Sequence, residues 1–339
     1  MKVLILTEGG KNIGYGHVTR CLALYDAFEE AHIKPDIVVH GDDSVMGMLK
    51  CKRYSILDWS REKAKVFKVA REMDIVIVDS YLAGHNFYVT LSGMVKLPVY
   101  IDDNMRIDYP CGVVMNGTAY AEKIEYPKIN KIHYLLGSRY ALLRKEFFDV
   151  PRKRIRKNVK SVLVTFGGCD PRNVTPKVLN LLSREYPHLN KNVVVGRGFK
   201  HANELKTYGD KNTIFINDPT ADFIKELMAI SDIAISAGGQ TVYELARMGV
   251  PSIVITVAEN QVRNSMFLSR AGVIDHVGYY TDDERGNDKI MMKLKTDVDH
   301  VIHDRVMRLE RYLNGKKIVD GRGARRAVKE IVLYMECNK

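Results

Sequence analysis

Short runs of hydrophobic residues alternate along the chain with segments in which hydrophobic positions recur every three or four residues. Runs rich in Val and Ile are typical of strands that are covered on both faces. The predicted strands are Lys2–Thr7, Asp36–His40, Asp74–Val78, Leu97–Ile101, Ser161–Thr165, Asn192–Val195, Ile214–Ile216, Ile233–Ser236 and Ser252–Val257. Helical spacing is found over 18–28, 242–246 and 324–336. This alternation predicts an α/β fold with parallel sheets and right-handed crossovers.

The regular pattern is interrupted near Pro151, where a strongly basic segment with little periodicity begins. A fresh strand then restarts the pattern at Ser161. We therefore predict an N-terminal Rossmann-like domain over 1–145, a basic linker over 146–160 and a C-terminal domain over 161–320. The helix predicted over 324–336 is expected to join the N-terminal domain.

Composition narrows the class of protein. The 339 residues are 46% hydrophobic and 27% charged, which excludes wholesale disorder and suits two domains. Lys and Arg number 52 against 41 Asp and Glu, a net charge of +11 that favours anionic partners. The basic run has no interleaved aromatic residues and the chain has one Trp, so the sequence argues against nucleic-acid binding.

The five cysteines lie far apart and form no C-x-x-C pair, which predicts free thiols in a reducing compartment. No hydrophobic stretch approaches the roughly 20 residues that span a bilayer. The apolar run at the start is too short for a signal peptide. We expect a soluble, cytoplasmic protein without stable membrane insertion.

Three glycine pairs follow predicted strands: Gly9-Gly10, Gly167-Gly168 and Gly238-Gly239. Glycine lets the backbone approach a ligand, and amides at a following helix N-terminus can hold phosphate. Three such loops suggest a ligand cleft between two Rossmann-like domains, although ordinary tight turns are the alternative. The dinucleotide fingerprint fails at Thr19, and no P-loop string is present.

The string from Gly14 to Arg20 follows the first strand and opens an amphipathic helix. Gly14 and Gly16 precede His17, which is therefore placed at the positive end of the helix dipole. That position favours a neutral imidazole, able to accept a proton near neutral pH. A histidine that only caps the helix is the alternative.

A second glycine-rich string precedes another predicted helix. The amides of Gly238, Gly239 and Gln240 could bracket a diphosphate, and Glu244 could accept both hydroxyls of a ribose. The spacing of Thr241 and Glu244 also fits a capping box, which needs no ligand. Spacing alone favours the cap.

Polar side chains follow other predicted strands. Asn260 and Gln261 carry carboxamides that can donate to sugar or phosphate oxygens, although a polar loop would look the same. Carboxylates and a phenol follow two further strands, as Asp79 with Tyr81 and Asp102 with Asp103. These groups could bind Mg²⁺ or act as acid or base, or they could form turns and helix caps.

Taken together in chain order, these strings resemble the UDP-sugar hydrolase family of pseudaminic acid biosynthesis and its spore-coat-polysaccharide relatives. The matching segments are 13–22, 78–81, 101–103, 135–144, 166–171, 236–239, 249–251, 260–261 and 320–324. They span nearly the whole chain, which makes the resemblance more specific than any single motif.

The resemblance implies a glycosyltransferase-B fold, with two Rossmann-like domains whose parallel sheets face an interdomain cleft. It implies inverting attack of water on the anomeric carbon of UDP-2,4-diacetamido-2,4,6-trideoxy-β-L-altropyranose, releasing UDP and the free sugar without a metal or other cofactor. The N-terminal domain would hold sugar and water, and the C-terminal domain UDP. Other enzymes of nonulosonic acid biosynthesis would be possible partners.

Individual roles carry over by position. His17 matches the residue that orients or deprotonates the water, Tyr81 one near the sugar, and Glu244 the residue that grips the ribose. Asn260 and Gln261 match carboxamides near sugar and diphosphate. The other predicted substrate contacts are Gly14, Gly16, Arg20, Gly168, Gly238, Gly239, Gln240 and Thr241.

The chain departs from the family pattern at three places. Thr7 and Glu8 stand where an arginine and an aspartate are usual after the first strand. The usual Asp-His-Tyr-Gly string has Ser80 and Leu82 here, and Gln240 replaces a serine in the glycine-rich loop. The first two changes line the expected sugar side, so they leave the UDP assignment intact and the exact sugar open.

Two other functions fit the same residues. A glycosyltransferase of this fold would move the sugar to an acceptor, and a non-catalytic subunit would only bind the UDP-sugar. A membrane-working transferase usually has a basic, apolar patch on its N-terminal domain, whereas the basic residues here gather at the linker. This favours the hydrolase.

Overall fold

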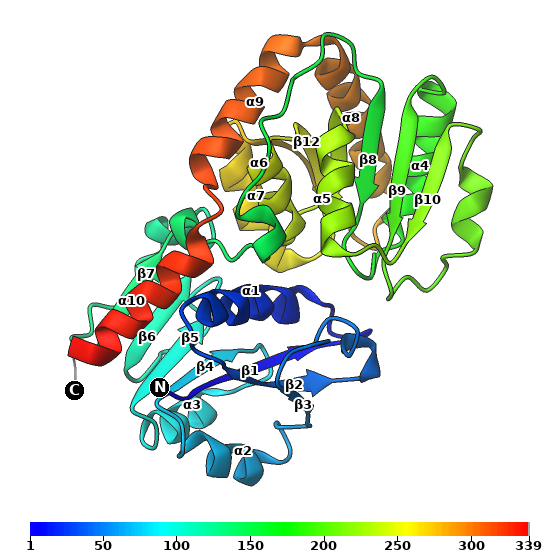
Figure 1. The fold of residues 1–339 in the computed structure, drawn as a ribbon. Coiled ribbons are helices and arrows are strands. Elements are labelled where there is room, and N and C mark those ends of the chain that lie inside the picture. The colour runs from blue at the N-terminus through cyan, green and yellow to red at the C-terminus, as the bar shows by residue number, and fades with distance from the viewer. Residues whose placement is uncertain (338–339) are drawn as a thin grey trace. The chain divides into compact units, whose positions relative to one another are not determined.

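The computed structural model describes residues 1–337 and divides into two compact units, each built on a parallel sheet (Figure 1). Unit 1 comprises Met1–Phe148 with Gly321–Lys339, and unit 2 comprises Asp149–Asp320. The division thus falls between Phe148 and Asp149, near the start of the segment predicted as a linker. The predicted α/β class with parallel sheets is confirmed.

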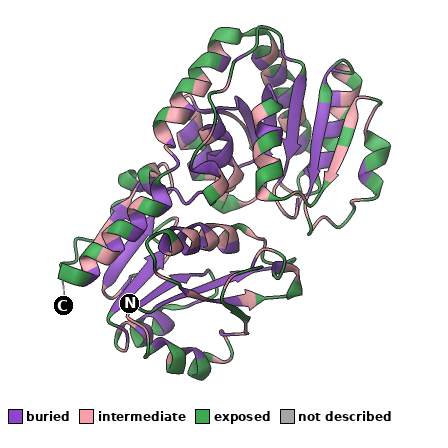
Figure 2. Cartoon of the chain, viewed as in Figure 1, coloured by how far each residue is buried: buried purple, intermediate pink, exposed green. Residues whose placement is uncertain are grey.

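The sheet of unit 1 has seven strands in the order β3-β2-β1-β4-β5-β6-β7. Their bounds are β1 Val3–Gly9, β2 Asp36–Gly41, β3 Tyr54–Ile56, β4 Ile75–Asp79, β5 Leu97–Ile101, β6 Gly112–Asn116 and β7 Ile132–Leu136. The four central strands are buried along their whole length, as Figure 2 shows. Strands β1, β2, β4 and β5 were predicted, whereas β3, β6 and β7 were not.

Helices cover both faces of this sheet. Their bounds are α1 Gly16–Glu30, α2 Lys63–Ala70, α3 His85–Ser92 and α10 Gly323–Cys337. Alternate residues of the strands point to opposite faces, so Ile5 packs in one core with α1 and α10, and Leu4 packs in another with α2 and α3. Helix α10, from the end of the chain, packs directly against α1.

The sheet of unit 2 has six strands in the order β10-β9-β8-β11-β12-β13. Their bounds are β8 Ser161–Thr165, β9 Asn190–Val195, β10 Thr213–Asn217, β11 Ile233–Ala237, β12 Ser252–Thr256 and β13 Ile274–Tyr279. The helices are α4 Val174–Glu185, α5 Ala221–Ile230, α6 Thr241–Met248, α7 Glu259–Arg270, α8 Glu284–His303 and α9 Arg305–Ile318. All of these strands except β13 were predicted.

Short 3₁₀ segments complete the elements within residues 1–337: η1 Asp43–Val45, η2 Ala121–Lys123, η3 Ser138–Tyr140, η4 Lys145–Phe147 and η5 Glu204–Tyr208. None of the helices within residues 1–337 is both long and apolar enough to cross a lipid bilayer. Because the strands of each sheet are parallel, their carboxyl ends meet at one edge, and that edge carries the residues considered next.

Candidate functional site

His17 faces the last residue of a neighbouring strand at the carboxyl edge of the unit 1 sheet. It lies in the first turn of α1, and its Nδ1 is 2.7 Å from Oδ1 of Asp79, which ends β4. The side chain of His17 is 12% exposed and that of Asp79 is fully buried. An ionised carboxylate only accepts hydrogen bonds, so we assign the proton to Nδ1, which leaves Nε2 as a proton acceptor.

Arg20 keeps Asp79 ionised. Burial alone would raise the pKa of this carboxyl, but the charge of Arg20 and the hydrogen bonds of Arg20 and His17 hold it well below its ordinary value. The guanidinium donates from Nε to Oδ2 and from Nη2 to Oδ1, both at 2.6 Å. This bidentate geometry fixes the carboxylate against the imidazole.

Tyr81 and Asp103 complete what we call the unit 1 cluster, which comprises His17, Arg20, Asp79, Tyr81 and Asp103. Nη1 of Arg20 donates to Oδ1 of Asp103 at 2.7 Å, and the Tyr81 hydroxyl donates to Oδ2 at 2.5 Å. The His17 and Tyr81 rings meet edge to face, with centroids 4.7 Å apart. The structure thus brings the two predicted catalytic residues, His17 and Tyr81, together. The Arg20 guanidinium lies between the carboxylates of Asp79 and Asp103 and positions both.

Glu8 holds the turn that carries Tyr81. Its buried carboxylate accepts hydrogen bonds from the Ser80 hydroxyl, from the Tyr81 amide at 2.8 Å and from the Leu82 amide at 3.4 Å. The guanidinium of Arg106 lies over the Tyr81 ring, 5.9 Å from its centroid. Glu8 and Ser80 were both noted as departures from the family pattern, but the sequence did not indicate that they touch.

The two adjacent aspartates after β5 have different roles. Asp102 accepts hydrogen bonds from the amides of Met105 and Arg106 and from the hydroxyls of Tyr109 and Tyr126, so it stabilises a turn. Asp103 joins the unit 1 cluster. Within residues 1–337, His, Cys, Asp and Glu side chains form no group of three or more that could hold a metal ion.

The glycine loop after β1 closes on itself just before α1. The amides and carbonyls of Gly10 and Gly14 pair in both directions, at 3.0 and 2.8 Å. Gly14 has φ of +92°, a left-handed conformation that side chains rarely adopt. A Cβ at Gly14 or Gly16 would meet nothing within 4 Å, so both predicted contacts border open space.

In unit 2, the side chain of Gln261 forms hydrogen bonds with both the loop after β11 and the loop after β12. Its side-chain oxygen accepts hydrogen bonds from the amides of Gly238 at 3.2 Å and Val257 at 3.0 Å. The Gly238 amide, predicted to face a diphosphate, is therefore used within the protein. A Cβ at Gly238 would lie 2.5 Å from Oγ of Ser265, so glycine is required there by packing.

Helix α6 begins at Thr241, and Gln240 occupies the preceding cap position without a side-chain cap hydrogen bond. The predicted capping box is therefore wrong, because Thr241 is already helical. Glu244 is buried in this helix, only 2% exposed. A Cβ at Gly239 would have its nearest neighbour 3.7 Å away, at Nε2 of Gln261, so open space adjoins this residue. In the first turn of α6, the amides of Val242 and Tyr243 donate to the carbonyls of Gly239 and Gln240, both at 3.1 Å.

The remaining predicted contacts follow neighbouring strands. The Gly168 carbonyl accepts from the Gly198 amide at 2.8 Å, and Asn260 is exposed in the first turn of α7. Asp170, which the motifs did not single out as a contact, caps α4 through the amides of Val174 and Thr175. The loops after β8, β11 and β12 therefore gather at one edge of this sheet.

The chain is similar to known proteins over most of its length. Residues 162–296 match the glycosyltransferase family 28 C-terminal domain. The chain is 24% identical to the spore coat polysaccharide biosynthesis protein SpsG of Bacillus subtilis, over 95% of each chain. It is also 24% identical to the Helicobacter pylori pseudaminic acid cytidylyltransferase and UDP-2,4-diacetamido-2,4,6-trideoxy-β-L-altropyranose hydrolase, over 83% of this chain and 49% of that protein. The chain resembles the SpsG and pseudaminic acid hydrolase proteins. The resemblance predicted from the sequence is confirmed.

A further relative is the uncharacterized protein MJ1062 of Methanocaldococcus jannaschii, 29% identical over 77% of this chain and 57% of that protein. The chain thus spans about half the length of two of these three relatives.

Solved structures show the fold. MurG of Acinetobacter baumannii superposes with a TM-score of 0.66 at 14% identity, covering 98% of this chain and 99% of that one. The Staphylococcus aureus MnaA–UDP complex gives 0.66 at 14% identity, covering 99% and 97%. The predicted glycosyltransferase-B class is confirmed.

Proposed function

We propose that this protein is a nucleotide-sugar hydrolase that cleaves UDP-2,4-diacetamido-2,4,6-trideoxy-β-L-altropyranose, or a close relative of it, to UDP and the free sugar. The observation that carries the proposal is the contact between His17 and the ionised Asp79. It presents a half-buried imidazole in one orientation and one tautomer, as a general base requires. The Helicobacter pylori relative, whose name includes this hydrolase activity, supports the same function.

In the proposed reaction, Nε2 of His17 takes a proton from water as the water oxygen bonds to the anomeric carbon. The bond from that carbon to the phosphate oxygen breaks, and UDP leaves with the electron pair. The transition state has oxocarbenium character, so the reaction needs an aligned water and a stabilised leaving group. Tyr81, in edge contact with His17, lies where it can contact the sugar.

We assign the leaving diphosphate to the glycine loop of unit 2. The space beside Gly239, at the amino end of α6, can hold its oxygens, as helix N-termini commonly do. Gln261 acts by fixing the Gly238 peptide, and Glu244 is assigned to the ribose. This arrangement neutralises the leaving group with backbone dipoles, so we propose that no metal takes part.

Glycosyl transfer is the second candidate, because residues 162–296 match a glycosyltransferase domain. The chemistry at the anomeric carbon is the same, with an acceptor hydroxyl in place of water. A subunit that only binds the nucleotide sugar would bind UDP and turn over none of it.

The deciding assay measures UDP release from a panel of UDP-sugars with EDTA and without an acceptor. The panel includes the diacetamido-trideoxy altrose and bacillosamine compounds beside UDP-GlcNAc. We expect multiple turnovers with one diacetamido sugar, lost in His17→Ala while UDP binding is kept. Binding of UDP without release from any sugar would reject the hydrolase.

A further inference from the structure

The basic segment that was predicted as a linker is held in unit 2 by backbone hydrogen bonds. The buried Arg308 donates from Nη2 to the carbonyls of Arg156 and Lys157, at 3.0 and 2.8 Å. Ile155 is buried, and the Lys160 amide donates to Asp232 at 2.8 Å. The backbone that carries these cationic side chains is therefore held in place.

The ammonium group of Lys153 lies at the carboxyl end of α5. It donates to the carbonyls of Met228 and Ala229 at 2.9 Å and of Ser231 at 2.5 Å. Burial lowers the pKa of Lys153 to about 8, against the opposing charge of Asp232, so it is still an ammonium at neutral pH. With its carbonyls satisfied, the negative end of the helix no longer repels an anion at this place.

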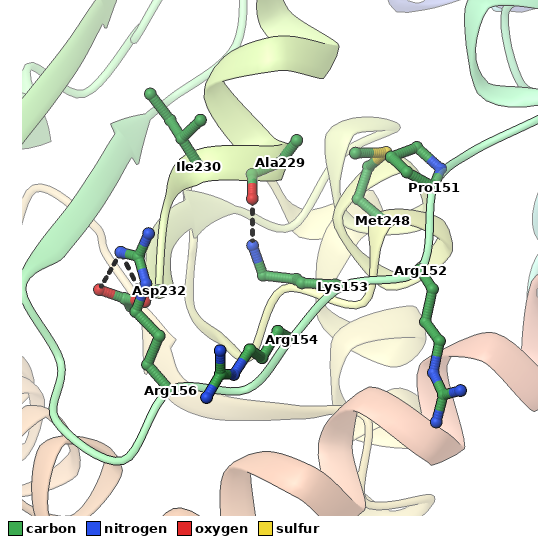
Figure 3. A pocket seen from close by; sticks show the side chains of 9 residues that line it. All are labelled: Pro151, Arg152, Lys153, Arg154, Arg156, Ala229, Ile230, Asp232 and Met248. Atoms are coloured by element: carbon green, nitrogen blue, oxygen red, sulfur yellow. Dashed lines mark hydrogen bonds and ion pairs between the residues drawn. The ribbon is translucent and has the colours of Figure 1, made fainter.

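A cavity of about 280 Å³ lies between this segment and α5 (Figure 3). Four cationic side chains line it, those of Arg152, Lys153, Arg154 and Arg156, and Asp232 is the one carboxylate among the lining residues. Arg156 lies 3.3 Å from Asp232, whereas Arg152 and Arg154 pair with no carboxylate within residues 1–337. The lining therefore carries an excess of three positive charges.

We propose that this cavity binds a small phosphate-bearing anion. Guanidinium groups match phosphate geometry, and a fixed backbone lowers the ordering cost of bringing several of them to one ligand. The cavity has the size of a small molecule, which favours a soluble ligand over a membrane surface.

This site is separate from the one assigned to UDP. Asp232 precedes β11, and the cavity adjoins the amino end of that strand, whereas Gly238 and Gly239 follow its carboxyl end. The five residues of β11 lie between the two sites, and so do the eight residues of α6, whose last residue Met248 lines the cavity, which separates the sites by roughly 10 Å or more. The inference does not depend on the proposed hydrolysis.

Inorganic pyrophosphate is the probe, titrated calorimetrically into the full chain with saturating UDP present. We expect one saturable equivalent, bound at least about tenfold more weakly by the double variant Arg152→Gln, Arg154→Gln. Lys157→Gln is the matched control, because it removes one charge from the same segment outside the cavity lining. It should bind within about twofold of wild type, and thermal unfolding should show that every variant is folded.

Absence of saturable binding, or an equal weakening in Lys157→Gln, would overturn the proposal. Vesicles of phosphatidylglycerol and phosphatidylcholine form the second arm, and we expect no sedimentation with them that depends on these arginines. Arginine-dependent vesicle binding without pyrophosphate binding would instead identify a membrane surface as the ligand.

Discussion

Nδ1 of His17 lies 2.7 Å from Oδ1 of Asp79, and Arg20 grips the same carboxylate with two nitrogens. The three residues form a unit in which the arginine keeps the aspartate ionised and the aspartate orients the imidazole. If His17 is the base, its competence depends on both partners, although neither needs to touch the substrate.

Asp79→Asn should therefore damage catalysis more than binding. The amide supplies no charge and can present an N–H to Nδ1, which would favour the wrong tautomer. We expect kcat for UDP release to fall by about a hundredfold or more, with the Kd for UDP within twofold of wild type. A comparable loss of UDP affinity would show that the variant acts on binding.

The free energy of unfolding should also depend on the ionised Asp79 and its contacts with His17 and Arg20. The pKa of Asp79 is depressed in the folded state, so its contribution is present above its ordinary value near 4 and is lost as pH falls below it. Above about pH 5, Asp79→Asn should lower the free energy of unfolding by about 3–5 kcal/mol, because it leaves Arg20 without half of its buried pairing. Denaturant titrations from pH 7 down to pH 3 should show the difference shrinking. A difference independent of pH would contradict the assignment.

Two neighbouring glycines give a matched pair of tests in unit 2. Gly239→Ala has room for its methyl group, so it should leave unfolding unchanged and weaken UDP binding about tenfold by filling the ligand space. Gly238→Ala would meet Ser265 and Thr256 at 2.5 and 2.8 Å, so it should cost about 1–3 kcal/mol of stability. Unimpaired UDP binding by folded Gly239→Ala would remove the diphosphate from this loop.

Glu8→Gln tests whether the turn at Tyr81 is held for function. The substitution replaces one acceptor oxygen by an NH₂ group, which is a donor and cannot accept a hydrogen bond from the Tyr81 or Leu82 amide. We expect KM for the sugar nucleotide to rise and kcat to fall, so that kcat/KM decreases by roughly ten- to a hundredfold. The pH profile of kcat should stay unchanged. Ser80→Ala, which removes one of these contacts, should have the smaller effect. Loss of thermal stability without a change in KM would indicate a purely structural role.

Most of the strands that were predicted have a clear hydrophobic pattern, although β6 was missed and is buried along its whole length. Strand β4 is wholly buried and apolar up to its last residue, whereas β13 carries Asp275, His276 and Gly278. Strand β3 has only three residues, of which Tyr54 and Ser55 are exposed. Their pairing depends on neighbouring strands, which no local pattern reveals.

The site divides in the same way. The sequence placed Asp79 and Asp103 after two strands, but their common partner Arg20 is 59 and 83 residues away from them. The capping box failed because α6 starts one residue earlier than that motif requires, with Gln240 before it. Spacing identifies candidate groups, and only the packed sheet shows which of them share a proton or a charge.

The central claim is that water attacks the anomeric carbon. It is tested most directly by running the reaction in ¹⁸O-labelled water without an acceptor and measuring the mass of the released UDP by mass spectrometry. We predict UDP of unchanged mass, because the bond that breaks joins the sugar carbon to the phosphate oxygen. UDP that carries ¹⁸O in its terminal phosphate would place the attack on phosphorus, and the absence of UDP release would contradict hydrolysis altogether.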